Sequence, residues 1–177
     1  MTSTVFPPLV CIVGKSDSGK TTLIEKLVPA LAGLGLRVGT IKHDVHGFDI
    51  DHPGKDSWRH KRAGAAMTVI SSPRKLALVK DTDRDHGLDE LLAYFDGCDL
   101  VLTEGYKRER KPKIEVYRSE AHPEPLCRGD ENLIALVSDE DLDLGVPRFG
   151  LEDAAGLARF LKDRFHGPAL KAVEEGP

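Results

Sequence analysis

The residues of this sequence with the clearest chemical potential lie at 14–21, where GKSDSGKT matches the pattern GxxxxGK(S/T). An apolar run precedes this segment at 9–13 and apolar residues at helical spacing follow it, which is the context that the pattern requires. Backbone N–H groups of such a loop and the positive end of the following helix attract phosphate. Lys20 can then reach the β- and γ-phosphate oxygens, and Thr21 can place its hydroxyl on Mg²⁺. The segment therefore predicts a site for the triphosphate of GTP or ATP with Mg²⁺.

The residues expected to contact nucleotide here lie in the loop or at the start of the helix. They are Gly14, Lys15, Ser16, Asp17, Ser18, Gly19, Lys20, Thr21 and Thr22. Lys20 is also a candidate catalytic residue. Lys15 is a candidate second phosphate-facing cation, used across a dimer in some phosphate-loop proteins, and a solvated lysine is the alternative. Thr22 also fits an ordinary helix position.

A carboxylate ends the apolar segment DLVLTEG at 99–105. A parallel strand here delivers Glu104 to the sheet edge where the phosphate loop lies, and the carboxylate can hold Mg²⁺ or its waters. Glu104 is therefore a candidate metal ligand and, with Lys20, a candidate catalytic residue. The alternative is a solvated carboxylate, or one that caps the next turn.

The segment DVHGFDIDHPGKD at 44–56 is too polar for a core element and long for an idle connection. Asp44, Asp49 and Asp51 can approach Mg²⁺ or its waters, and Asp51 is the predicted metal ligand among them. Lys55 and Arg59 could reach phosphate, and Lys55 is the predicted contact of the two. An ordinary solvated loop is the alternative.

A base-reading residue is harder to find, because the chain has no NKxD sequence. Asp139 follows the apolar run at 133–137, and its carboxylate could accept hydrogen bonds from guanine N1–H and N2–H, which adenine cannot supply. The alternative is that Ser138 and Asp139 begin a helix. The basic run YKRERKPK at 106–113 suits the phosphates of a pterin substrate or an acidic partner, and a solvated loop is the alternative.

Apolar periodicity predicts an α/β protein in which these residues meet at one sheet edge. We expect strands at 9–13, 37–43, 100–103, 114–117 and 133–137, an antiparallel hairpin at 67–80, and helices after residue 19 and at 57–65, 88–95 and 151–165. Ser57 is expected to cap the second helix, and Pro29 to kink the first or end it early. The fold class is a three-layer P-loop NTPase with a mostly parallel sheet and an antiparallel hairpin extension. We expect one domain over 1–177 with a polar tail at 166–177.

Composition is that of an ordinary globular protein, with 177 residues, 40% hydrophobic and 31% charged. A formal charge of −4 predicts no general attraction to nucleic acid or to an anionic membrane. The cysteines Cys11, Cys98 and Cys127 form no CxxC pair, and we expect reduced thiols. No apolar stretch approaches a membrane span, so a cytoplasmic location is expected.

Three segments together carry a family resemblance: GKSDSGKTTL at 14–23, IKHDVHGFDIDHPGKDSWRHKRAGA at 41–65 and DLVLTEGYK at 99–107. In their order and spacing the chain resembles the molybdopterin-guanine dinucleotide biosynthesis protein B (MobB) family over roughly 9–139. The resemblance implies a GTP-binding, weakly hydrolysing homodimer that assists the guanylyltransferase attaching GMP to molybdopterin. It also implies that the hairpin pairs with the other subunit. Direct contact with molybdopterin stays open.

Two alternatives remain. A P-loop small-molecule kinase would use the basic run as a lid, but no residue is forced into the place of an acceptor base. A metallochaperone-type GTPase would bind metal through His43, His46, His52 and His60, whose spacing matches no closed zinc pattern.

Overall fold

The computed structural model describes residues 6–44 and 46–167. These divide into two compact units: the residues up to His43 together with those from Leu92 onward, and the segment Asp44–Leu91. The hairpin expected to mediate dimerisation lies in the second unit. The predicted polar tail begins inside the last helix, and residues 168–177 of it lie outside the described residues.

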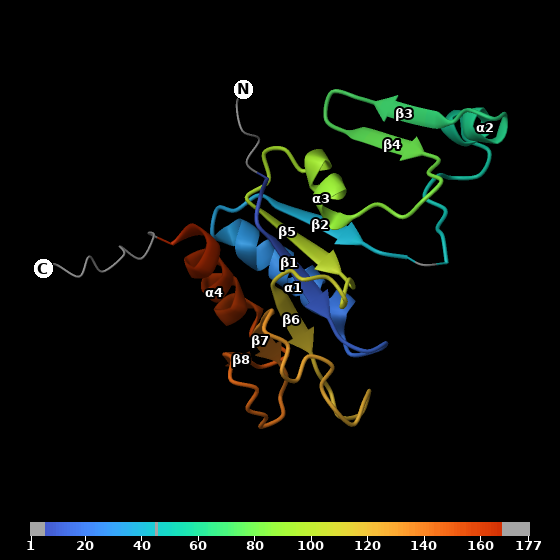
Figure 1. The fold of residues 1–177 in the computed structure, drawn as a ribbon. Helices are drawn as coiled ribbons and strands as arrows, with labels where there is room; N and C mark the ends of the chain where they lie inside the picture. Colours follow the sequence, from blue (N-terminus) through green and yellow to red (C-terminus); the bar gives the residue numbers. More distant parts are fainter. Residues whose placement is uncertain (1–5, 45, 168–177) are drawn as a thin grey trace, which may run out of the picture. The chain divides into compact units, whose positions relative to one another are not determined.

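The first unit is built on a six-stranded sheet in which every neighbouring pair is parallel (Figure 1). Its order is β2 (Val38–Lys42), β5 (Leu100–Glu104), β1 (Leu9–Val13), β6 (Lys113–Val116), β7 (Leu133–Val137) and β8 (Arg148–Phe149). All five residues of β1 and of β7 are buried, as continuous apolar strands of a parallel sheet require. The carboxyl ends of the strands share one edge, so segments far apart in sequence meet there.

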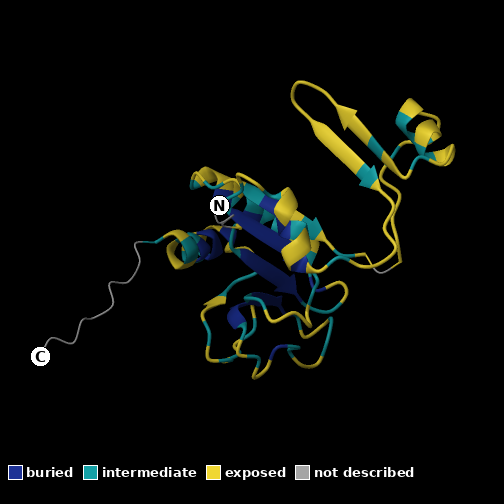
Figure 2. Cartoon of the chain, turned by 45° about the horizontal axis from the view of Figure 1, so that its top comes forward, coloured by how far each residue is buried: buried dark blue, intermediate teal, exposed yellow. Residues whose placement is uncertain are grey.

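Two helices cover one face of this sheet. Helices α1 (Lys20–Gly33) and α4 (Ala154–His166) place their leucines in one core with side chains of the strands. Figure 2 shows the strands of this sheet coloured mainly as buried. Asp153 begins α4, because its carboxylate accepts the Gly156 N–H at 2.9 Å. The expected start at 151 was therefore three residues too early. The mostly parallel sheet and the α/β class are confirmed.

Helix α1 does not end at Pro29 but continues to Gly33, so the expected early end was wrong. Proline removes a helical hydrogen bond to the carbonyl four residues earlier, here that of Glu25. Both residues lie on the exposed side of the helix, where water can satisfy that carbonyl. Leu23, Leu27 and Leu31 remain buried on the opposite side and hold the helix to the sheet.

The second unit contains α2 (Asp56–Arg62), the antiparallel strands β3 (Met67–Ser71) and β4 (Leu76–Lys80), and α3 (Leu88–Leu91); the short 3₁₀ helix η1 (Leu92–Tyr94) follows in the first unit. The hairpin is confirmed, with Val69 opposite Leu78. Helix α2 begins one residue before Ser57, and Lys55 stands at the cap without a side-chain hydrogen bond. The expected Ser57 cap was therefore wrong.

All three cysteines are free thiols, as expected. Within the described ranges, no helix is both long enough and apolar enough to span a bilayer.

Candidate functional site

The phosphate loop joins β1 to α1 and has a shape that only glycine permits at its first position. Gly14 has φ of 151°, and a Cβ there would lie 2.5 Å from the Val116 carbonyl oxygen and 2.6 Å from Ser18 Oγ. Gly19, at φ of 96°, is the N-cap of α1 and supplies no side-chain cap. The first turn of α1 carries no acidic residue either. The N–H groups and positive end of the helix are thus left available to an anion.

A cavity of about 490 Å³ opens at this loop. Its lining residues come from the loop, the first turn of α1 and the end of β5: Ser16, Asp17, Gly19, Lys20, Thr21, Thr22 and Glu104. The Lys20 ammonium lies across the loop and donates to the Lys15 carbonyl oxygen at 2.6 Å. A bound phosphate would compete for that ammonium, because a charged acceptor makes the stronger hydrogen bond.

Thr21 and Glu104 meet at the edge of this cavity. The Thr21 hydroxyl donates to Glu104 Oε1 at 3.0 Å. Sheet register explains the meeting: Glu104 pairs with Ile12, so β5 ends beside the start of the loop. The carboxylate therefore faces the helix start and does not cap the next turn. Its oxygen and the hydroxyl suit Mg²⁺, which uses one or two protein oxygens and completes its octahedron with phosphate and water.

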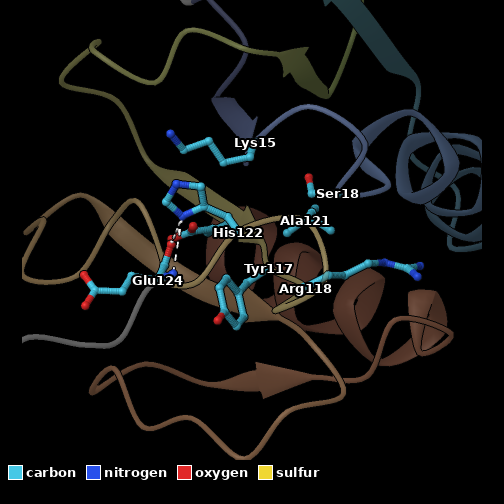
Figure 3. A pocket seen from close by; sticks show the side chains of 9 residues that line it. Lys15, Ser18, Tyr117, Arg118, Ala121, His122 and Glu124 are labelled. Atoms are coloured by element: carbon cyan, nitrogen blue, oxygen red, sulfur yellow. Dashed lines mark hydrogen bonds between the residues drawn. The ribbon is translucent and has the colours of Figure 1, made fainter.

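Not every predicted residue of the loop lines that cavity. Lys15 and Ser18 instead line a small recess with residues following β6, including Tyr117, Arg118 and His122 (Figure 3). The recess leaves no volume for even a water-sized ligand. The Ser18 hydroxyl is buried there without a hydrogen-bond partner among the described residues. A phosphate role for Lys15 stays a prediction.

Asp139 follows β7 and lines a second cavity, of about 250 Å³, with Arg118 and Leu151. Its Oδ1 accepts the Leu151 backbone N–H at 2.9 Å. No helix begins at this point, so the helix-start alternative was wrong. Its other carboxylate oxygen has no hydrogen bond within 6–44 or 46–167 and stays available to a ligand.

The acidic segment belongs to the second unit. Asp51 Oδ1 accepts the backbone N–H of His52 at 2.8 Å, and Lys55 is exposed directly before α2. Their roles toward Mg²⁺ and phosphate stay predictions. Among the residues that the structure describes, no three histidine, cysteine or acidic side chains are grouped to hold a metal.

The residues of the basic run at 106–113 differ in exposure. Lys113 is the first residue of β6; its side chain is 3% exposed, and Nζ lies 3.0 Å from Asp130 Oδ2. This lysine is therefore unavailable to a ligand, contrary to expectation. The Asn132 backbone N–H, with Lys113, lowers the pKa of Asp130 from 3.8 to about 2. Lys107, Arg108 and Arg110 remain exposed.

Two residues near the loop escaped the sequence reasoning. Glu115 is buried in β6, and its carboxylate accepts the N–H groups of Leu126 at 2.6 Å and Cys127 at 2.9 Å, which anchors the segment after β6. Arg118 leaves the same strand and lies against Gly19. The sequence did contain a signal for Arg118, because a parallel strand predicted at 114–117 delivers the side chain that follows it to the sheet edge where the phosphate loop lies.

A parallel sheet whose central strand runs through a glycine loop into a Lys-Thr helix start defines a P-loop nucleotide-binding protein. Residues 9–139 match the family model of Molybdopterin guanine dinucleotide synthesis protein B, MobB. The chain belongs to this family, as the resemblance indicated.

Individual relatives of the chain support the same family assignment. The chain is 42% identical over 160 residues to the molybdopterin-guanine dinucleotide biosynthesis adapter protein of Escherichia coli (strain K12), covering 87% of this chain and 91% of the relative. The Haemophilus influenzae adapter protein is 38% identical over 165 residues, with 90% and 92% covered. A crystal structure of molybdopterin-guanine biosynthesis protein B superimposes with a TM-score of 0.70 at 32% identity, covering 88% of this chain and 99% of the other.

Proposed function

We propose that this chain is a GTP-binding adapter protein in the synthesis of molybdopterin guanine dinucleotide, where it assists the guanylyltransferase in the cytoplasm. The observation that carries the proposal is the pairing of Thr21 with Glu104 beside Lys20 and the uncapped start of α1. This arrangement offers a cation, N–H donors and hard oxygen ligands in one cavity. Membership of the MobB family supports the pathway.

Thr21 and Glu104 would hold Mg²⁺. The ion would supply charge stabilisation for the β- and γ-phosphates. Lys20 leaves the Lys15 carbonyl and binds the same phosphates. Thr21 orients its hydroxyl through the hydrogen bond that Glu104 accepts.

GTP is preferred because Asp139 presents one carboxylate oxygen to the base while the other is held by Leu151. Guanine offers N1–H and N2–H to such an acceptor, whereas adenine presents an acceptor at N1. An unpaired carboxylate opposite adenine loses hydrogen bonds that water had supplied.

Hydrolysis is slow in the isolated protein. The chain contains no glutamine to orient an attacking water, and the lining of the 490 Å³ cavity includes no arginine. A protein with these features binds GTP and turns it over weakly, which suits an adapter that acts through a partner.

The protein works as a homodimer through its hairpin. Met67, Val69, Leu76 and Leu78 share one face of the two strands, and each is at least 45% exposed. A lone two-stranded sheet is marginal in water, and its outer edges invite pairing. Sedimentation of the wild type and of Val69→Thr with Leu78→Thr tests this: the variant should be monomeric, and a monomeric wild type at micromolar concentration contradicts the dimer.

Calorimetric titration of the protein with Mg·GTP and Mg·ATP tests the nucleotide step. Wild type should bind GTP about tenfold or more tightly than ATP, and Lys20→Ala should lose at least about tenfold in affinity. Lys26→Ala is the matched control, since it removes the same charge from the same helix where Lys26 faces Glu152. ATP preference would favour a kinase, and no binding of either nucleotide would refute the proposal.

Addition of the protein to a purified molybdenum cofactor guanylyltransferase with molybdopterin and GTP tests the adapter step. Guanylyl transfer should rise with wild type and stay at its basal rate with Lys20→Ala. An equal rise with both would separate the adapter role from nucleotide binding and would contradict this mechanism.

A further inference from the structure

The Arg118 side chain lies between the phosphate loop and the cavity at Asp139. Arg118 leaves the sheet directly after Tyr117, whose N–H still donates to the Val137 carbonyl at 3.0 Å. A Cβ built on Gly19 would lie 3.5 Å from Nη2 of Arg118 and 3.7 Å from its Nε. Figure 3 shows the side chain extending away from His122 and Glu124. The guanidinium therefore packs on the N-cap of α1.

Arg118 is half-buried, and its guanidinium lacks the partners that a desolvated donor needs. Its Nε is buried and makes no hydrogen bond, and Arg118 forms no ion pair, within the described parts of the chain. Burial of an unsatisfied donor is unfavourable, and buried polar groups are rarely left without a partner. The neighbouring helix start adds a positive partial charge to the same place. An anion bound here would accept a hydrogen bond from the guanidinium and would be attracted by the helix start.

The two cavities identify which anion fits. Gly19, beside Arg118, lines the 490 Å³ cavity of the phosphate loop, and Arg118 itself lines the 250 Å³ cavity with Asp139. A nucleoside triphosphate with its terminal phosphates in the first cavity and its base in the second passes Arg118 where phosphate joins ribose. The planar guanidinium suits phosphate oxygens because it donates two parallel N–H bonds.

We propose that Arg118 binds the α-phosphate of the nucleotide and so couples the phosphate loop to the base cavity. The inference rests on the proposed nucleotide function and assigns Arg118 to its nucleoside end. Arg118 then distinguishes nucleotides from free pyrophosphate, which carries only the two phosphates that the loop itself holds.

Titration of wild type, Arg118→Met and Arg118→Lys with Mg·GTP, Mg·GDP and Mg·pyrophosphate tests the proposal. Arg118→Met should weaken GTP and GDP by about 10- to 100-fold and change pyrophosphate less than about twofold. Arg118→Lys keeps the positive charge but cannot donate the two parallel N–H bonds of a guanidinium. It should therefore bind GTP and GDP more tightly than Arg118→Met and less tightly than wild type. Arg159→Met, which removes an exposed arginine from α4, is the matched control and should bind all three as wild type does.

Two results of these titrations would contradict a contact between Arg118 and the α-phosphate. Equal losses for GTP and pyrophosphate would mean that Arg118 only shapes the loop, and unchanged GTP affinity would mean no contact; either overturns the inference. Failure of wild type to bind GTP would overturn the proposed function and the inference with it. Thermal unfolding of each variant identifies loss of folding, and Arg118→Lys carries the test if Arg118→Met does not fold.

Discussion

The Thr21 hydroxyl donates a hydrogen bond of 3.0 Å to Oε1 of Glu104, although 83 residues separate them in the chain. The contact exists because β1 and β5 are parallel neighbours and end at the same edge, with Ile12 opposite Glu104. It joins the start of α1 to the end of β5 across the mouth of the cavity. A hydroxyl that donates its hydrogen in this way keeps the lone pairs of its oxygen free to bind a divalent cation.

Replacement of Glu104 by glutamine removes the charge at this contact while leaving an oxygen that can accept from Thr21. We expect the apparent affinity for Mg²⁺ in the presence of GTP to fall about tenfold or more, because Mg²⁺ prefers carboxylate over amide oxygen. GTP binding without Mg²⁺ should change little. Titration of Mg²⁺ against bound nucleotide measures this, with Glu152→Gln, which faces Lys26, as the control. Unaltered Mg²⁺ dependence would remove Glu104 from the metal site.

A methyl group at Gly14 would collide with backbone. The Val116 carbonyl oxygen would lie 2.5 Å from the new Cβ, and the φ of 151° is unsuited to alanine. We expect Gly14→Ala to lower the free energy of unfolding by about 2–4 kcal/mol and to abolish GTP binding. Urea unfolding measures the first effect and calorimetry the second.

Gly33→Ala is the control for that substitution. Gly33 ends α1 with open space around its Cβ position, so alanine should leave stability unchanged or raise it by up to about 1 kcal/mol. If both variants were equally stable and bound GTP alike, the close approach of the loop to β6 would have no energetic importance.

Asp139→Asn keeps an oxygen for the Leu151 N–H but replaces the other carboxylate oxygen by an amide that donates. We expect GTP affinity to fall by about 10- to 100-fold, and ATP affinity to hold or rise, with little change in stability. Parallel calorimetric titrations with both nucleotides measure the preference. Asp141→Asn, two residues away and fully exposed, is the control. A GTP preference that survives in Asp139→Asn would mean that the base is read elsewhere.

Stability should depend on pH through Asp130. Its pKa is lowered to about 2 from 3.8, chiefly by the Asn132 N–H and further by Lys113, so the ionised form stabilises the folded state. This contribution is complete above about pH 4 and is lost as the pH falls from 4 to 2. Asp130→Asn should therefore lower the free energy of unfolding by about 1–2 kcal/mol at pH 7, and the difference from wild type should shrink over that range.

Urea unfolding at pH 7, 4 and 2.5 measures this difference. Asp143→Asn is the control, because its Oδ1 also accepts a nearby backbone N–H, that of Gly145, without a buried lysine beside it. If the difference in unfolding free energy between Asp130→Asn and wild type were constant with pH, the charge of Asp130 would not contribute. The effect would then arise from the turn at 130–132 alone.

The sequence predicted these elements best where local pattern and tertiary packing agree. The run at 133–137 is a strand with those bounds because all five side chains are buried on both faces. At Pro29 the expected early end of α1 did not occur, since three buried leucines on the opposite side hold the helix to the sheet. At Lys113 the sequence showed one more charge in a basic run, and only the fold reveals that this lysine is buried and paired with Asp130.

The sequence by itself determined the phosphate loop, because GxxxxGKT, the apolar strand before it and the helix after it are neighbours in the chain and obey short-range sterics and hydrogen bonding. It also placed Glu104 and Asp139 at strand ends. Only the tertiary structure decided that β5 lies beside β1, bringing Glu104 to Thr21, and that the chain after β6 turns Arg118 onto Gly19. Strand order and side-chain packing depend on contacts between residues distant in sequence, whose free energies arise from the whole core and not from any one segment.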